Sequence, residues 1–384
     1  MKLRVEIIKD LEGFSTLEAV WNPLLDRSGT DSVFLTYEWI FTCWAHFCHA
    51  NKLFIIVVWN GPAIIVIVPL MVAKTKGFRQ LCMIANCIST SDDIDFIIDD
   101  SADKEQVVRE IFDALDLEKG WDFLKLGRFS TDSANYFAFN SVWARYPSWR
   151  IIWKKDDTKL YVPIEGTFDD YFHSLKKSFR ESTAKHQKHL DKKTLSYCFS
   201  DEIHSEKIRE IIDEIIDLKV DKYGSEETMF NNSSTRPFFA DFAEKAYSLG
   251  WLRISTMFIN DENAAMLLGF QYKDKYYAVF TCYKPNYGNY SPGRMIEIRQ
   301  IKRCFELGLR EYDTLNGVID YKFQYNVKAR ERHEVFLFRS GLKGRITRRL
   351  LLGVRMPERL RNIRAVDIMV RAAKKILKRY VSAD

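Results

Sequence analysis

The chain has 384 residues, of which 47% are hydrophobic and 14% aromatic. This composition excludes an intrinsically disordered protein and supplies enough apolar residues for a substantial core. No apolar run approaches the ~20 residues of a membrane-spanning helix, and the N-terminal residues MKLRVEIIKD lack the apolar core of a signal peptide. The seven cysteines show no CxxC spacing, so we expect reduced thiols in a cytoplasmic protein.

The net charge of +6 is distributed unevenly along the chain. Residues 341–384 hold 13 Lys and Arg against 3 Asp and Glu, an excess of +10, so the remainder sums to −4. Within this tail, apolar residues recur at spacings of three and four from Ile363 to Tyr380, which predicts an amphipathic helix. The tail therefore either packs on the body of the protein or lies against an anionic membrane surface, and we expect packing.

Residues 1–157 are predicted to form a mixed α/β domain. The hydrophobic periodicity predicts helices at 17–25, 37–47 and 104–117, and strands at 53–59, 62–72, 93–98 and 121–126. The segment 43-CWAHFCH-49 brings two Cys and two His together. Zinc sites usually draw ligands from two chain segments, so we expect no metal at this segment.

Residues 158–340 are predicted to form a second domain of the same class. The pattern predicts a helix capped by Thr167, helices at 203–222, 236–249 and 293–307, and strands at 160–164, 251–258, 264–272, 276–283 and 311–315. A hairpin, a helix and a strand thus follow one another in both halves. The predicted fold class is α/β with mixed sheets, built from two similar domains and a basic helical tail.

The segment 287-YGNYSPGRMIEI-298 joins a predicted strand to a predicted helix. The first amides of a helix have no partner within it and carry partial positive charge, so this end can bind a phosphate or a carboxylate. Gly293 permits a close backbone approach, and Pro292 fits the first helical turn. The alternative is a loop that only connects two elements, because Gly and Pro often precede helices.

A second polar cluster, 313-DTLNGVIDYKFQYN-326, follows the predicted strand 311–315. In open α/β sheets, ligands bind beyond the carboxyl ends of the strands. Lys322 is a candidate for stabilising an oxyanion, and Asp320 or Tyr321 is a candidate for moving a proton. The alternative is a solvated polar loop.

Several motifs occur in the order that is typical of a known family. They are Trp21, 33-VFLTYEWIFTCWAHF-47, 68-VPL-70, the basic segment 173–193, Gly250-Trp251-Leu252-Arg253, the strand pair and turn 264–294, and 308-GLREYDTLNG-317 followed by 321-YK-322. This order resembles the CelD-type acetyltransferases of the GNAT superfamily, and the resemblance covers about residues 21–326.

The resemblance implies tandem GNAT-like domains, as in the Fem-type aminoacyl transferases. It also implies acyl transfer from acyl-CoA to an amine or hydroxyl of a sugar or cell-envelope precursor, which would enter a cleft between the domains. Lys322, Asp320 and Tyr321 are then expected to be catalytic. The residues expected to bind or line the cofactor site are Tyr283, Tyr290, Ser291, Gly293, Arg294 and Asn316.

Other functions stay open at this point. The usual phosphate loop of the superfamily, Q/R-x-x-G-x-G/A, is absent around Gly293, so an aminoacyl-tRNA donor is an alternative to acyl-CoA. The segment 173–193 has seven Lys or Arg and is either a solvated face or a contact for a phosphate-rich partner. Two further alternatives are a non-catalytic envelope-assembly protein that docks on the membrane through residues 341–384, and a nonspecific nucleic-acid binder. We expect no sequence-specific binding of nucleic acid.

Overall fold

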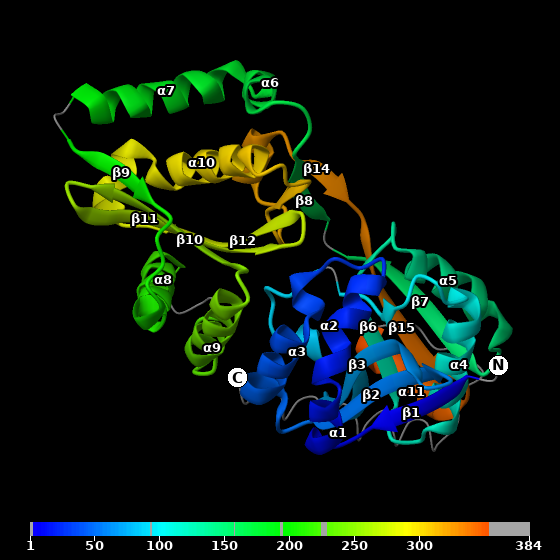
Figure 1. The fold of residues 1–384 in the computed structure, drawn as a ribbon. Helices are drawn as coiled ribbons and strands as arrows, with labels where there is room; N and C mark the ends of the chain where they lie inside the picture. The colour runs from blue at the N-terminus through cyan, green and yellow to red at the C-terminus, as the bar shows by residue number, and fades with distance from the viewer. Residues whose placement is uncertain (1–2, 93, 157, 193–194, 224–228, 353–384) are drawn as a thin grey trace.

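The computed structural model describes residues 3–352 except 93, 157, 193–194 and 224–228. In this part of the chain the strands form two mixed sheets that are covered by helices, which confirms the predicted α/β class (Figure 1). Of the predicted tail at 341–384, only helix α11 (Leu342–Leu352) lies within the described residues. None of the described helices is both long and apolar enough to cross a membrane.

The first sheet is built mainly from the N-terminal half of the chain. Its strands lie in the order β1 (Arg4–Ile8), β2 (Lys52–Asn60), β3 (Ala63–Thr75), β4 (Phe78–Met83), β6 (Phe123–Ser130), β15 (Arg332–Arg339) and β7 (Trp149–Lys155), while β5 (Ile97–Ile98) pairs with β3. All of these pairings are antiparallel except that of β4 with β6. The strand predicted at 93–98 is therefore reduced to the two residues of β5.

Among the described helices, α11 packs on β15 of the first sheet, and five helices of the N-terminal half surround this sheet. They are α1 (Leu11–Thr16), α2 (Glu18–Arg27), α3 (Tyr37–Cys43), α4 (Lys104–Leu117) and α5 (Ala134–Val142). Local sequence explains where α3 and α4 begin, because the side chains of Thr36 and Asp103 accept hydrogen bonds from the first-turn amides of Trp39 and Gln106. Helix α4 then buries one apolar stripe, as its periodicity predicts.

The second sheet has the strand order β14 (Lys328–Arg330), β8 (Lys159–Pro163), β13 (Glu311–Asp313), β12 (Lys275–Tyr283), β11 (Glu262–Tyr272), β10 (Leu252–Ile259) and β9 (Tyr197–Ser200). One face is covered by α6 (Phe168–Ser174), α7 (Lys177–Lys192) and α10 (Pro292–Glu306), and the other by α8 (Ile208–Tyr223) and α9 (Thr235–Ser248) (Figure 1). Successive residues of β11 alternate between these faces. Leu267 joins the cluster around α10, whereas Met266 and Leu268 join the cluster that contains α8 and α9.

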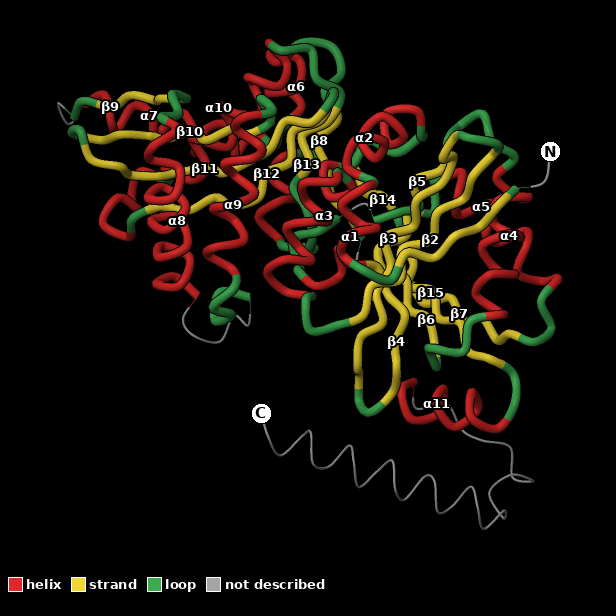
Figure 2. Tube along the Cα trace, turned by 60° about the horizontal axis from the view of Figure 1, so that its bottom comes forward, coloured by secondary structure: helices red, strands yellow, loops and turns green. Residues whose placement is uncertain are grey.

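Strand β15 lies in the range predicted for the second domain, 158–340, but it pairs in the first sheet, between β6 and β7. The sheets therefore do not follow the predicted boundary at residue 340. Successive side chains of β15 point to opposite faces of the sheet, and both faces are covered. Val335 and Leu337 join the main core, whereas Phe336 and Phe338 face a small cluster that includes residues of α11. Figure 2 shows α11 beside the strands β6, β15 and β7.

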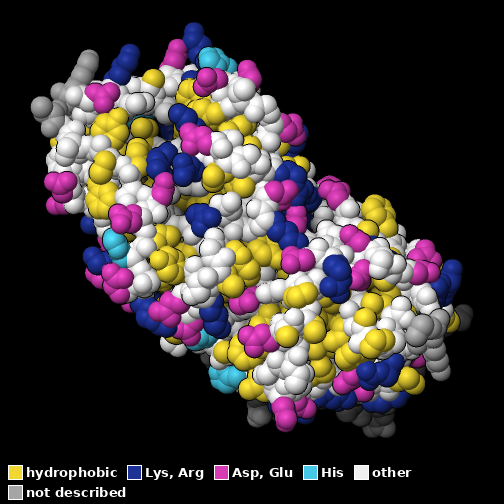
Figure 3. Space-filling view, in the orientation of Figure 1, with side chains coloured by type: hydrophobic (Ala, Val, Ile, Leu, Met, Phe, Trp, Pro, Cys, Tyr) yellow, Lys and Arg dark blue, Asp and Glu magenta, His cyan; other side chains and the backbone are white. Residues whose placement is uncertain are grey.

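Each sheet and its helices form one lobe of the protein. The two lobes form one elongated body and are in contact (Figure 3). Trp39 of α3 is fully buried and packs its ring against Phe238 and Phe242 of α9, with ring centroids 5.0 and 4.7 Å apart. A second connection starts at β15 of the first sheet, where the Arg332 guanidinium forms a buried ion pair with the Asp92 carboxylate of the same lobe. Arg332 Nη1 also donates to Asn316 Oδ1 at 2.9 Å. Apolar packing and buried charge thus join the first sheet to the second.

This ion pair generates a prediction about stability. In Arg332→Leu, the Asp92 carboxylate loses its buried cationic partner, and the free energy of unfolding should fall by about 3–5 kcal/mol. Replacing both residues, as in Arg332→Leu/Asp92→Leu, should recover part of the loss because no charge is then left buried. Urea unfolding of the three proteins measures both effects, and a loss below about 1 kcal/mol in the single variant would contradict the role of this pair.

Candidate active site

The second sheet contains a gap between its parallel strands β12 and β13. The two strands pair only from Lys275 opposite Glu311 to Tyr277 opposite Asp313, whereas β12 continues to Tyr283. A register shift opposite Gly269 also bulges β12 between Ala278 and Phe280. Beyond Tyr277, the edge of β12 that faces β13 therefore has no strand partner among the described residues, and a cavity of about 700 Å³ opens beside it.

Helix α10 begins at the wall of this cavity, as the glycine-rich segment predicts. Ser291 precedes the helix in the left-handed conformation, with φ 49° and ψ 50°, and its side chain caps no helical amide. The amides of Arg294 and Met295 both donate to Ser291 O, at 3.0 and 3.1 Å. Pro292 has no N–H to donate. Of the remaining first-turn amides of α10, that of Gly293 has no backbone acceptor among the described residues. The helix end thus offers one open amide.

Helix α7 covers the turn before α10. His186 contacts the backbone oxygen of Asn289 at 3.1 Å and the hydroxyl of Ser291 at 3.2 Å. Arg294 Nη1 donates to Ser182 Oγ at 2.9 Å. The guanidinium of Arg294 lies at the cavity wall and stacks over the Phe179 ring, 4.8 Å from its centroid. The predicted basic helix thus positions one cation, Arg294, beside the open helix end.

A buried carboxylate lies one turn further along α10. Glu297 lines the cavity and is 7% exposed. Burial raises the pKa of this carboxyl above its ordinary value, while hydrogen bonds from Tyr325 and Thr281 act in the opposite direction. The Thr281 hydroxyl donates to Glu297 Oε1 at 2.7 Å. A carboxyl group with a raised pKa on a cavity wall is a candidate for proton transfer.

Tyr312 is another residue of the cavity lining. Its side chain is 2% exposed, and within the described part of the chain its hydroxyl has no hydrogen-bond partner. Buried hydroxyl groups are nearly always hydrogen-bonded in folded proteins, so the Tyr312 hydroxyl is an exception.

Lys322, the predicted oxyanion donor, lies at the cavity but is used differently. Its ammonium donates to four backbone oxygens, those of Thr314 and Asn316 at 2.8 Å, Gly317 at 3.0 Å and Leu315 at 3.3 Å. Burial lowers the pKa of Lys322 to about 8, although Asp313 and other nearby carboxylates favour the charged form. An ammonium has three donors, and here they are all directed at the loop 314–317. The geometry makes Lys322 a residue that positions this loop.

The other predicted residues divide into two groups. Asp320 is exposed and does not line the cavity, and Tyr290 packs its ring against His189, 5.2 Å between centroids, also outside the lining. The Asn316 amide donates to Ser89 O of the first lobe at 2.7 Å, so this residue connects the two lobes at the cavity. The predicted residues that line the cavity are Tyr283, Ser291, Gly293, Arg294, Asn316, Tyr321 and Lys322.

The sequence contained a signal for Glu297 that motif reasoning missed. Helix α10 buries Ile296, Ile301 and Cys304 on one face, and Glu297 and Gln300 occupy the same buried face. A charged residue in an otherwise apolar stripe is a candidate for function, because buried carboxylates need a specific partner. The partners of Glu297, Thr281 and Tyr325, come from a strand and a loop that no local pattern links to α10.

The contacts of Lys322 yield a test of its role. In Lys322→Met, the carbonyl oxygens of residues 314–317 lose their donor, and the free energy of unfolding should fall by about 1–3 kcal/mol. Lys219→Met is the matched control, because Lys219 also lines the cavity and its ammonium lies over the Phe280 ring, 5.5 Å from the centroid. Chemical denaturation of both variants distinguishes the roles: equal and small losses would show that Lys322 does not hold the loop.

Comparisons with known proteins agree with this geometry. Residues 177–323 match a family model described as an acetyltransferase (GNAT) domain. This range includes β12, α10 and the loop 314–317, together with Lys322, which holds that loop. A search of curated proteins finds no match.

Solved structures share the fold over most of the chain. FemX is similar with a TM-score of 0.63 and 10% identity, over 91% of this chain and 100% of that one. A conserved protein of unknown function from Bacteroides thetaiotaomicron gives 0.53 and 12%, over 87% and 100%. The C-terminal domain of a putative lysylphosphatidylglycerol synthetase from Agrobacterium fabrum gives 0.52 and 9%, over 84% and 92%. Most residues that line the cavity thus lie in the range that matches the GNAT model, within a fold similar to that of FemX.

Proposed function

We propose that the protein transfers an acyl group from acyl-CoA to an amine or hydroxyl of a sugar or cell-envelope precursor. The observation that carries this proposal is the position of the cavity. It runs along the unpaired edge of β12, meets the open end of α10 and has the Glu297 carboxyl in its wall. The match of residues 177–323 to a GNAT domain supports the same reaction class.

The unpaired edge of β12 suits an extended donor. Peptide groups beyond Tyr277 can pair with the amides of the donor's pantetheine arm, as they would with an added strand. The donor's pyrophosphate is then placed near the Gly293 amide and the Arg294 guanidinium. A Cβ at Gly293 would lie 3.4 Å from the Tyr283 ring, so glycine leaves this approach open.

Glu297 is assigned as the general base of this reaction. It takes the proton from the attacking amine or hydroxyl, whose nitrogen or oxygen forms a bond to the thioester carbonyl carbon as the carbon–sulfur bond breaks. The leaving thiolate takes a proton from Tyr321, which lines the mouth of the cavity. Lys322 holds the loop 314–317 in place. Asp320 has no role in this scheme because it lies outside the cavity.

The acceptor is proposed to enter between the lobes. Ser89 and Thr90, from the first lobe, line the same cavity as Lys219 of α8 and Asn316 of the connecting loop. The cavity therefore offers hydroxyl, amide and ammonium groups to a polar acceptor. Such groups suit a sugar hydroxyl or amine, which needs several hydrogen bonds. We place the reaction in the cytoplasm, where acyl-CoA is available.

The assignment of Glu297 has a direct test. Glu297→Gln keeps the side-chain volume but removes the base, so turnover should fall about 100-fold or more while donor affinity is retained. The wild-type rate should fall as the pH drops through the pKa of Glu297, because only the ionised carboxylate accepts a proton. Since this pKa is raised, the fall should occur at a higher pH than for an ordinary carboxyl group.

The control for Glu297→Gln is Glu306→Gln, at an exposed carboxyl near the end of α10. The assay measures acyl transfer as the rate at which free CoA thiol is released, with several amino sugars and sugars as acceptors. Full activity of Glu297→Gln would remove this residue from the mechanism.

The donor site is tested at Gly293. In Gly293→Val, the branched side chain meets Tyr283 and Thr281 and crowds the helix end, so affinity for acetyl-CoA should fall at least about tenfold, equivalent to ~1.4 kcal/mol. Gly293→Ala adds only a methyl group at ordinary contact distance and should bind nearly as well. Calorimetric titration of both variants measures the difference. Equal affinities for the wild type and the valine variant would place the donor elsewhere.

An aminoacyl-tRNA donor is the second candidate. Helix α7, which covers the turn before α10, presents the exposed lysines Lys177, Lys185 and Lys188, and these suit a larger phosphate-rich ligand. Loss of activity after RNase treatment would favour this donor over acyl-CoA. A non-catalytic protein that docks on the envelope membrane, or a nonspecific binder of nucleic acid, would show no turnover with either donor.

A further inference from the structure

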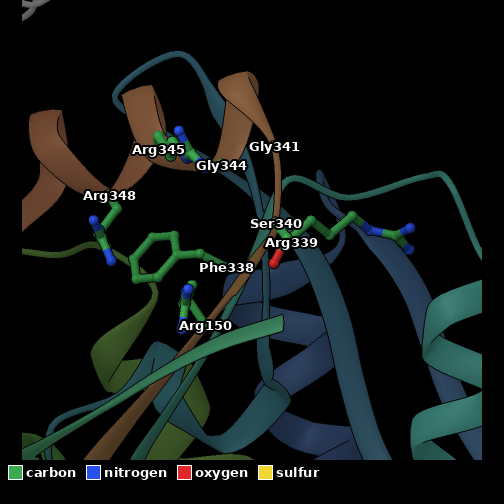
Figure 4. A pocket seen from close by; sticks show the side chains of 8 residues that line it. All are labelled: Arg150, Phe338, Arg339, Ser340, Gly341, Gly344, Arg345 and Arg348. Carbon is green, nitrogen blue, oxygen red and sulfur yellow. The ribbon is translucent and has the colours of Figure 1, made fainter. Parts of the chain in front are cut away.

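A second cavity lies at the end of β15 that is remote from Arg332. It has a volume of about 350 Å³ and is lined by residues of β7, β15 and α11 (Figure 4). Arg150 of β7 is the cross-strand neighbour of Phe338. Arg345 and Arg348 come from α11, where a spacing of three places them on one helical face. None of these residues takes part in the acyl-transfer site.

Close packing fixes the geometry of this arginine pocket, the cavity lined by Arg150, Phe338, Arg345 and Arg348. Phe338 is 1% exposed and stacks on Phe123, 5.8 Å between ring centroids. At Gly344, an added Cβ would lie 1.8 Å from the backbone oxygen of Arg339, so the first turn of α11 rests directly on β15. Figure 4 shows the side chains of Arg348 and Arg150 near the Phe338 ring, whereas Arg345 lies nearer the start of α11.

The arginines of this region differ in their partners. Arg339 donates to the backbone oxygens of Leu115 and Asp116 and lies over the Trp121 ring, 4.9 Å from its centroid. Figure 4 shows its side chain directed away from the other arginines. By contrast, Arg150, Arg345 and Arg348 have no carboxylate within ion-pair distance anywhere in the described ranges. Three like charges thus line one cavity with no carboxylate of the described residues paired to them, and an anion that binds there relieves their repulsion.

We propose that the arginine pocket binds a phosphate group. Guanidinium groups match phosphate oxygens with paired hydrogen bonds, and three of them suit a doubly charged phosphomonoester better than a single carboxylate. The pocket also lies at the start of the basic segment 341–384, which has 13 Lys and Arg in its sequence. The phosphate belongs either to a lipid headgroup on an anionic membrane or to a free phosphate compound. This site is independent of the proposed acyl transfer.

The test compares two neighbouring arginines of α11 in the full-length protein. Arg348→Gln removes a wall of the pocket, whereas Arg349→Gln makes the same change of charge at a residue that does not line it. One arm titrates pyrophosphate by calorimetry. The other arm measures flotation with phosphatidylcholine vesicles that contain phosphatidic acid, with pure phosphatidylcholine vesicles as the blank.

The proposal expects binding by the wild type in at least one arm. Arg348→Gln should weaken that binding about tenfold or more, because it removes a charge-assisted hydrogen bond, and Arg349→Gln should change it by less than about twofold. Binding of vesicles alone identifies the headgroup, and binding of pyrophosphate identifies a free phosphate. Equal losses in the two variants, or no binding in either arm, would overturn the proposal. Matching thermal melting of the variants shows that both remain folded.

Discussion

The chain passes from the second sheet to the first between β14 and β15, and buried charges there hold the crossing loop, residues 314–317, in place. Arg332, at the start of β15, pairs with Asp92 of the first lobe and donates to Asn316 of the crossing loop. Lys322 holds the same loop through four backbone oxygens. A buried cation with its donors satisfied gives this segment one conformation, whereas an unpaired one would destabilise the fold.

The candidate active site follows from this crossing. Strand β13 has three residues, and the chain then turns into the crossing loop before β14 rejoins the second sheet, so β12 keeps an unpaired edge beyond Tyr277. The loop that departs forms one wall of the cavity, and α10, with Glu297, forms another. The first lobe contributes Ser89 and Thr90 because the crossing loop contacts it at Asn316. Both lobes are thus needed for a complete site.

Local sequence patterns predicted most elements that position this site, and α4 begins and ends at the predicted residues. The start of α10 and the pair β11–β12 were also close to expectation, because Gly, Pro and strand alternation act locally. The position of β15 was not predictable in this way, since no residue of 332–339 indicates pairing with β6 and β7. For the same reason, the sequence placed Lys322 near the site, but its contacts depend on how the crossing loop folds. Glu297 was missed because its burial depends on tertiary packing.

The central claim is that the gap between β12 and β13 holds an acyl thioester. A crystal structure of the full-length protein with acetyl-CoA tests it most directly. The account expects the pantetheine arm along the unpaired edge of β12, the pyrophosphate at the Gly293 amide and the acetyl group beside Glu297. Acetyl-CoA bound at another surface, with the cavity filled by the protein's own side chains, would contradict it.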